Sequence, residues 1–505
     1  MAIEYRIDLA QEGRTFPHYW ETCVGSCHAA TVLREDVRQQ IRAAHRDCGF
    51  RYLRFHGLLD DDMSVVLTDP FTQQIYYSFY NIDSIFDFLL DTGMKPFVEL
   101  GFMPQALASG TQTCFNYRGN VTPPKDYDQW SDLIRALTGH LLERYGQEEV
   151  RQWFFEVWNE PNLRFFFDGT QEDYFRLYEV TARAIKSVDS RLRVGGPATS
   201  VNAWIPEFRA YCENGDVPLD FITTHHYPND DPLSSAGMNG PGTKGQGLMA
   251  MSEEEAASMS QEEMQALIAQ FLAKPEPNPR DILAQMTRKA KEEAGDYPLY
   301  YTEWNGSIEY DTSYQAAIIA QTIAYNEGLV EGYSFWTVSD IFEEMGLKPG
   351  VFKNEVGIQT MDGIPKPSYQ IFKVLHEAGA RRLPVDGTPH RTAEVLALTD
   401  GAQITILAYN HDISRLDVKP EEMAITLEGE ISSIHKAVID EDHTNPQGVW
   451  QGMGSPVYLS RRQTAQLRDA AQLVYEPVGV EDGPAQTLRF TAQPESVTIF
   501  RVQRK

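Results

Sequence analysis

Cysteine is scarce in this sequence. Among 505 residues there are five cysteines, an odd number, all in the first half of the chain (Cys23, Cys27, Cys48, Cys114 and Cys212). A disulfide framework needs paired cysteines, so we expect reduced thiols that pack in the core. Cys23, Cys27 and His28 lie close together, but their spacing is loose and no second ligand pair follows, which favours packing over metal binding. We therefore expect no metal and no cofactor.

Basic residues are also scarce. Lys and Arg number 44 against 72 Asp and Glu, which gives a formal net charge of −28. Nucleic acids and anionic membranes are bound through a basic face that displaces counterions, so we expect neither partner. A neutral ligand suits this surface better.

Long hydrophobic runs are absent. No apolar stretch approaches the roughly 18 residues that a membrane span needs, and the N-terminal residues include acidic side chains without the apolar core of a signal peptide. We expect a soluble cytoplasmic protein with no membrane contact. Hydrophobic residues make up 42% of the chain, which is an ordinary globular composition, and the length exceeds one average domain.

The sequence is rich in short strand-like runs that alternate with stretches of helical period. This alternation is typical of repeated βα units around a parallel sheet. The expected strands are His18–Val24, Tyr52–His56, Lys95–Leu100, Trp153–Trp158, Arg193–Gly196, Phe221–His225, Leu299–Glu303 and Gly332–Trp336. The expected helices lie at 34–47, 81–92, 126–145, 171–187, 201–213, 281–294, 312–326 and 367–378. Eight units predict a (β/α)8 TIM barrel over residues 14–378.

Two regions depart from this alternation. Residues 228–280 predict an insertion after the sixth strand, with an acidic helix at 252–272; its GxGxxG at 240–245 has no strand before it and is not expected to bind a dinucleotide. Residues 379–505 consist of short alternating runs separated by Gly, Asp and Pro, which predict an accessory antiparallel β-sandwich. Residues 1–13 contain a strand that we expect to join this sandwich.

Two carboxylates stand at strand ends beside aromatic residues. Glu160 follows the fourth expected strand within WNEPN, where Pro161 predicts an extended conformation for Glu160, and Glu303 ends the seventh. In a barrel of this kind the chemistry lies at the C-terminal ends of the strands, so the two should face each other across the mouth. Such a pair is what cleavage of a glycosidic bond requires. We expect aromatic surroundings to keep Glu160 protonated, and Tyr227, Asn159 or Arg54 to keep Glu303 ionised.

Several motifs together resemble one family. They are YLRFHGLLDDD (52–62), FVELGFMPQALASGTQT (97–113), FEVWNEPN (155–162), YTEWN (301–305) and FWTVSDIFEEMG (335–346). The chain resembles glycoside hydrolase family 39, and within it the bacterial β-xylosidases. The resemblance implies an exo-acting retaining enzyme that releases xylose from short oligosaccharides, and it favours a homo-oligomer. Other exo-specificities of the family stay open, namely β-glucosidase, β-galactosidase, an arabinose-releasing enzyme and α-L-iduronidase, as does a non-catalytic sugar-binding barrel.

The resemblance also implies roles for individual residues. Glu160 would be the acid/base and Glu303 the nucleophile, and a cis peptide bond would follow Trp336. Apart from the resemblance, we expect Arg54 to support a catalytic carboxylate, with a packing role as the alternative. The sugar contacts would come from His56, Phe115, Asn159, His225, Tyr227, Trp336 and Glu344. Which member of each pair faces the sugar, His225 or His226 and Glu343 or Glu344, stays open.

Overall fold

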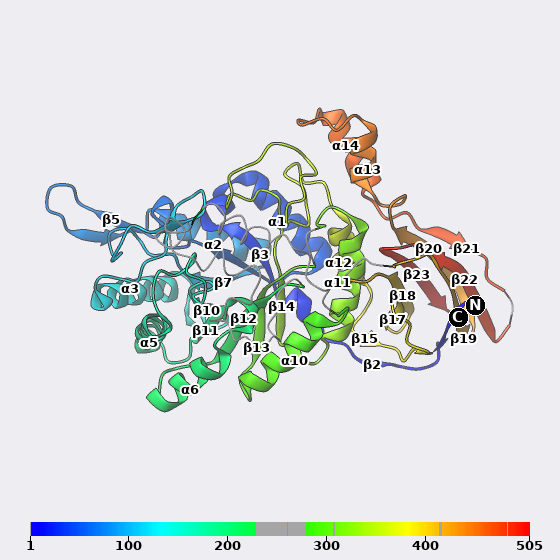
Figure 1. Ribbon diagram of the computed structural model, residues 1–505, viewed down its shortest axis with the longest axis horizontal. Helices are drawn as coiled ribbons and strands as arrows, with labels where there is room; N and C mark the ends of the chain where they lie inside the picture. The colour runs from blue at the N-terminus through cyan, green and yellow to red at the C-terminus, as the bar shows by residue number, and fades with distance from the viewer. Residues whose placement is uncertain (1, 229–259, 261–278, 307–308, 414–416, 482) are drawn as a thin grey trace.

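The computed structural model describes the chain except for residues 1, 229–259, 261–278, 307–308, 414–416 and 482. The described part consists of a barrel and a two-sheet sandwich at one end of the molecule (Figure 1). The predicted insertion at 228–280, with its helix and its GxGxxG, falls almost wholly outside the described residues. In the described residues no helix combines the length and hydrophobicity needed to cross a bilayer.

The barrel is closed by eight parallel strands, which confirms the predicted (β/α)8 fold. In barrel order the strands are β3 (Cys23–His28), β4 (Tyr52–His56), β7 (Lys95–Leu100), β10 (Phe154–Val157), β11 (Arg193–Thr199), β12 (Phe221–His226), β13 (Leu299–Trp304) and β14 (Gly332–Phe335). Seven of the predicted strands overlap an observed strand closely. The first was misplaced: residues 19–21 form a short 3-10 helix, and β3 begins at Cys23. Buried aromatic residues such as Trp20 made this capping turn look like a strand.

Helices surround the barrel (Figure 1). They are α1 (Glu35–Cys48), α2 (Tyr80–Thr92), α3 (Tyr127–Tyr145), α4 (Gln147–Val150), α5 (Gln171–Val188), α6 (Ile205–Gly215), α10 (Ile282–Ala294), α11 (Ser313–Tyr325) and α12 (Pro367–Glu377). Gly49 and Gly93 end α1 and α2 in the left-handed conformation that a residue without a Cβ adopts most easily. Helix α6 begins at Ile205, later than predicted, because residues 200–202 form a separate turn.

The N-terminal end of the barrel is filled by aromatic rings. Phe97 and Phe154 stack with their centroids 4.7 Å apart, and Phe221 and Tyr300 meet them edge-on. All four lie near the N-terminal ends of their strands. Because side chains alternate along a strand, Glu99, Glu156 and Thr302, each two residues further on, share the inward face nearer the mouth. The barrel interior therefore changes from aromatic at the bottom to polar at the top.

Short hairpins extend the loops at the mouth. Strands β5 (Val66–Thr68) and β6 (Ile75–Tyr77) pair after β4, and β8 (Thr113–Cys114) pairs with β9 (Gly119–Asn120) after β7. All five cysteines are buried free thiols, as predicted.

The sandwich contains a four-stranded and a seven-stranded sheet. The first orders β16 (Asp386–Gly387), β1 (Ile3–Asp8), β19 (Glu421–Glu428) and β22 (Ala485–Ala492). The second orders β2 (Arg14–Thr15), β15 (Arg381–Arg382), β17 (Ala393–Thr399), β18 (Gln403–Asn410), β23 (Ser496–Arg504), β20 (Ile431–Ile439) and β21 (Glu476–Val478).

The N-terminal strand joins the sandwich in an orientation that the sequence did not predict. β1 pairs in parallel with β19, whereas β19 and β22 are antiparallel. Its direction is free because β1 comes from the far end of the chain rather than from a hairpin. The domain boundaries at residues 13 and 378 stay predictions.

A helical hairpin of α13 (Pro446–Gly452) and α14 (Arg461–Ala470) was not predicted and protrudes between β20 and β21 (Figure 1). Leu467 of α14 packs with Val351, Phe352 and Ile364 of the loop between β14 and α12, which attaches the hairpin to the barrel.

Candidate active site

The two predicted carboxylates lie at the C-terminal ends of their strands and are almost fully buried. Glu160 is 8% exposed and Glu303 is 5% exposed. The predicted extended conformation of Glu160 is wrong: its φ is 43°, and Trp158 also has a positive φ, of 73°. Non-glycine residues adopt this region at a cost, and such residues gather at functional sites. The turn after β10, together with the bond from Glu160 N–H to the Ala198 carbonyl, fixes where the Glu160 side chain points.

His225 lies beside both carboxylates. Its Nδ1 is 3.0 Å from Glu160 Oε1 and 3.7 Å from Glu303 Oε2, and one oxygen of each carboxylate and a ring nitrogen of His225 lie within 4.8 Å of one another. Carboxyl groups of retaining glycosidases are about 5–5.5 Å apart, whereas inverting enzymes need about 6.5–9.5 Å for an intervening water. The separation is that of a retaining pair.

Arg54 is fully buried beneath the pocket and contacts three carboxylates. Its Nη1 is 2.7 Å from Glu303 Oε1, its Nε is 2.6 Å from Glu156 Oε2 and its Nη2 is 2.9 Å from Glu99 Oε2. Burial opposes its charge, but Glu156, Glu99 and Glu303 outweigh that effect and raise the Arg54 pKa above its usual value. Arg54 therefore stays positively charged and forms an ion pair with Glu303.

Glu303 accepts a second hydrogen bond, at its other oxygen, from the Tyr227 hydroxyl at 2.9 Å. Burial, and next the negative charge of Glu303, raise the Tyr227 pKa, so the phenol keeps its proton. The third predicted donor, Asn159, contacts Arg54 instead: its Oδ1 accepts from Nη2 at 2.9 Å. Glu303 is therefore held at both oxygens, by Arg54 at Oε1 and by Tyr227 at Oε2.

The contacts of Glu160 with His225 are of a different kind. Burial lowers the His225 pKa well below its usual value, so the ring is neutral. Its Nε2 lies 3.1 Å from Thr302 Oγ1, and the Thr302 hydroxyl donates to Glu156 Oε1 at 2.7 Å. The cation Arg54 contacts Glu303 and not Glu160 in the ion pairs of the described residues.

His56 forms the wall next to Glu303. Its Nδ1 bonds Glu99 Oε2 at 2.8 Å, while Nε2 lies 3.6 Å from Glu303 and 3.8 Å from Glu344. Burial lowers the His56 pKa to about 3, so the ring is neutral at physiological pH. Its ring centroid lies 4.7 Å from that of Trp336.

Trp336 and Phe115 bring aromatic surface to the same wall. Phe115 lies 6.2 Å from His56 by ring centroids and packs edge-on against the half-exposed Phe165. A cis peptide bond follows Trp336, as the resemblance implied. A Cβ on Gly25 of β3 would lie 2.3 Å from the Trp336 ring, so only glycine lets the indole approach this closely.

The two residue pairs left open by the sequence have distinct surroundings. His226 bonds the Tyr333 hydroxyl at 2.5 Å and stacks on Tyr301, so it turns away from the carboxylates that His225 contacts. Glu343 lies 3.9 Å from His28 and 3.6 Å from Arg34, whereas Glu344 lies near His56. The structure thus brings His225 and Glu344 to the pocket.

Sequence reasoning did not single out Glu99, Glu156 or Thr302 as functional residues. The signal was available, because each follows an inward aromatic residue by two positions in its strand.

Metal ligands could in principle come from Glu160, His225 and Glu303, whose atoms converge. Both oxygens of Glu303 are already held by Arg54 and Tyr227, and a cation beside Arg54 would be repelled. This donor set suits a proton-transfer and nucleophile pair better than a metal.

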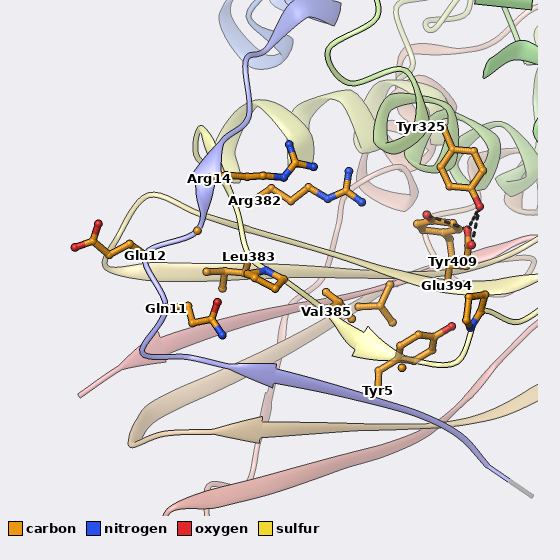
Figure 2. A pocket seen from close by; sticks show the side chains of 15 residues that line it. Tyr5, Gln11, Glu12, Arg14, Tyr325, Arg382, Leu383, Val385, Glu394 and Tyr409 are labelled. Atoms are coloured by element: carbon orange, nitrogen blue, oxygen red, sulfur yellow. Dashed lines mark hydrogen bonds between the residues drawn. The ribbon is translucent and has the colours of Figure 1, made fainter. Parts of the chain in front are cut away.

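A second cavity, of about 710 Å³, lies where the barrel meets the sandwich (Figure 2). There Tyr325 donates to both oxygens of Glu394, at 2.6 and 2.7 Å, and Arg280 lies 3.0 Å from the same carboxylate. Arg382 pairs with Glu327 at 2.8 Å. None of the predicted site residues is among the described residues that line this cavity, so the candidate active site is the barrel mouth.

A barrel with two opposed carboxylates at this separation defines the retaining glycoside hydrolases as a class. The family model for glycosyl hydrolases family 39 matches residues 3–275 and 269–481, and the chain belongs to this family.

Named relatives match almost the whole chain. A β-xylosidase of Caldicellulosiruptor saccharolyticus is 43% identical over 96% of this chain and 95% of its own length, and one of Geobacillus stearothermophilus is 35% identical over 98% and 95%. The crystal structure of a monomeric β-xylosidase from Caulobacter crescentus CB15 superposes with a TM-score of 0.81 at 30% identity and covers all of both chains.

Proposed function

We propose that this protein is an exo-acting retaining β-xylosidase that releases xylose from the non-reducing ends of short xylo-oligosaccharides. Glu303 attacks the anomeric carbon while Glu160 gives its proton to the leaving oxygen, which yields a covalent xylosyl-enzyme. Glu160 then takes a proton from water, which attacks the anomeric carbon and frees Glu303.

The observation that carries this assignment is the unequal surroundings of the two carboxylates. Glu303 rests on the cation Arg54 and accepts from Tyr227, which suits a group that must attack in its ionised form. Glu160 contacts the neutral ring of His225, which suits a group that must carry a proton. The acid and the nucleophile are thereby distinguished by their partners.

The neighbouring residues supply the proposed sugar contacts. His56, Asn159, His225, Tyr227 and Glu344 offer donors and acceptors for ring hydroxyls, and Trp336 and Phe115 offer apolar faces for C–H groups. The loop after β7 meets the loop after β14, because Asn116 N–H donates to the Glu344 carbonyl at 2.7 Å. This contact joins two loops beside the pocket, an arrangement that favours attack at chain ends over attack within chains.

The charges around the pocket argue against a uronate substrate such as that of an α-L-iduronidase. A uronate carboxylate needs a basic side chain, yet Arg54 is already engaged with three carboxylates. In the ion pairs of the described residues, no other Lys or Arg contacts these three carboxylates, so the pocket offers no free basic partner. A neutral pentose or hexose fits it better, and xylose is the sugar named for the relatives at 43% and 35% identity.

The experiment is a panel of nitrophenyl glycosides with Glu303→Ala, Glu160→Ala and, as a matched control, Glu343→Gln, whose carboxylate faces His28 and Arg34. The xyloside should be cleaved fastest, and Glu303→Ala should lose on the order of 10⁴-fold or more in kcat. Glu160→Ala should be impaired more in the second step than in the first, with azide restoring turnover because it needs no base. Full activity of the Glu303→Ala variant would contradict the proposed mechanism. Faster release of glucose than of xylose would contradict the proposed substrate.

The cytoplasm is the compartment we propose, and five buried free thiols support a reducing environment. The homo-oligomer stays a prediction that light scattering on the purified protein would test.

A further inference from the structure

The interior of the barrel holds a continuous chain of hydrogen bonds that ends on the proposed acid. It runs from the carboxylate of Glu156 to the hydroxyl of Thr302, then through the ring of His225 to Glu160. Thr302 is 1% exposed, and Glu156 and His225 are fully buried, so these three side chains have almost no surface in contact with bulk water. The direction of each bond can therefore be worked out from the number of protons available.

The direction is fixed at Thr302. A threonine hydroxyl has one proton, and here it goes to Glu156, a carboxylate that is also held by Arg54 at 2.6 Å. The lone pairs of Thr302 Oγ1 are then left to accept from His225 Nε2 at 3.1 Å. A neutral imidazole carries one N–H, so with Nε2 protonated, Nδ1 is an acceptor.

Glu160 must then be the donor in its contact with His225. Nδ1 lies 3.0 Å from Glu160 Oε1, and an acceptor nitrogen forms this bond only with a carboxyl group that carries its proton. The opposite tautomer would place an N–H against Glu160 and favour the carboxylate. The tautomer of His225 thus decides which form of Glu160 is stabilised.

We infer that Thr302 is a positioning residue, which fixes the tautomer of His225 so that Glu160 is held as the proton donor before substrate binds. The inference deepens the proposed function and rests on the role of Glu160 as acid. Thr302 touches no substrate in this account and acts only through His225.

Other groups around Glu160 and His225 also carry charge or titrate. They are Glu303, Glu344, Tyr227, Arg54, His56 and His226. A change at Thr302 leaves all of these in place and removes one hydroxyl. That hydroxyl also donates to Glu156, which keeps its ion pair with Arg54.

The test compares Thr302→Val, which keeps the shape of the side chain and removes the hydroxyl, with Thr302→Ser, which retains it. The readout is the pH profile of kcat/KM on xylobiose, whose leaving group needs the acid, and on a nitrophenyl xyloside, whose leaving group does not. In Thr302→Val the His225 ring can present an N–H to Glu160, so the carboxylate form gains stability. The alkaline limb on xylobiose should move to lower pH by roughly half a unit to one unit, and kcat/KM above that limb should fall by up to about tenfold.

Thr302→Ser should keep the wild-type limb, and the nitrophenyl substrate should be affected much less than xylobiose. Thr287→Val is the matched control, because Thr287 is equally buried but donates to the Leu283 carbonyl within α10. An unmoved alkaline limb in Thr302→Val, or an equal shift in Thr302→Ser, would overturn the inference. Failure of the proposed function would show separately, as full activity of Glu160→Ala on xylobiose.

Discussion

The barrel mouth and the junction between barrel and sandwich are both lined by aromatic rings, arginine and glutamate. At the junction each carboxylate has its own partners: Glu394 has Arg280 and Tyr325, while Glu327 pairs with Arg14 and Arg382. At the mouth the single cation Arg54 contacts Glu99, Glu156 and Glu303 at once. Similar residue types therefore give a junction in which each carboxylate has its own cation and a mouth in which three carboxylates share one.

The difference shows where the fold tolerates uncompensated charge. The balanced ion pairs at the partly exposed junction hold the two domains against each other. Because each charge there has an oppositely charged partner and keeps some contact with water, its desolvation cost is small. In the buried pocket, burial raises the pKa values of Glu99 and Glu344 well above the usual range, and the negative charges of nearby carboxylates add to this effect. Such groups are arranged in this way where a proton has to be held or moved.

The largest contrast should come from removing the arginine in each region. Arg54→Met leaves three buried carboxylates without their cation, so we expect loss of activity and a decrease of about 3–5 kcal/mol in the free energy of unfolding. Arg382→Met at the junction removes a partly exposed pair with Glu327 and should cost about 1 kcal/mol or less, with activity unchanged. Urea unfolding and xyloside kinetics on both variants provide the comparison.

Equal losses of stability in the Arg54→Met and Arg382→Met variants would contradict the contrast between the mouth and the junction.

A smaller effect should appear at Glu344. Burial, followed by the negative charges of Glu303 and Glu160, raises the Glu344 pKa well above its usual value, which favours the protonated carboxyl, for which an amide is a close substitute. We expect Glu344→Gln to retain kcat/KM within about tenfold, and Glu344→Ala to lose more, because it removes both the donor and the acceptor. As pH rises, Glu344 begins to ionise whereas glutamine does not. The pH profiles of kcat/KM for the wild type and Glu344→Gln should therefore diverge on the alkaline side.

A loss in Glu344→Gln as large as that in Glu303→Ala would show that Glu344 acts as an ionised group.

Much of the fold could be predicted from local pattern. Strands such as Lys95–Leu100 stand out because they are short, apolar and followed by a helical period, and eight of them imply closure. The first strand was misplaced because Tyr19 and Trp20 are buried in a turn, where burial alone imitates a strand. The parallel pairing of β1 with β19 could not be predicted, because register between distant segments depends on tertiary packing.

Some features of the site could likewise be predicted from the sequence, and others could not. Residues at strand ends, such as Glu160 and Glu303, could be placed at the mouth because the fold fixes that edge. The choice between His225 and His226 depends on a register shift between β12 and β13 that no local pattern encodes. The left-handed backbone at Glu160 could not be predicted either, because the following proline favours an extended conformation for the residue before it. The hydrogen bond from Glu160 N–H to the Ala198 carbonyl, a tertiary contact, overrides that preference.

The most direct measurement of the central claim is to trap the covalent intermediate. A 2-deoxy-2-fluoro-xyloside with an activated leaving group slows both steps, because fluorine destabilises the positively charged transition state, but the first step is helped by the leaving group. Mass spectrometry of the digested protein should then find the fluoroxylosyl group on Glu303, within the peptide that carries Tyr301 to Asn305. Attachment to Glu160 or Glu344, or no covalent species while the enzyme is inactivated, would contradict the account.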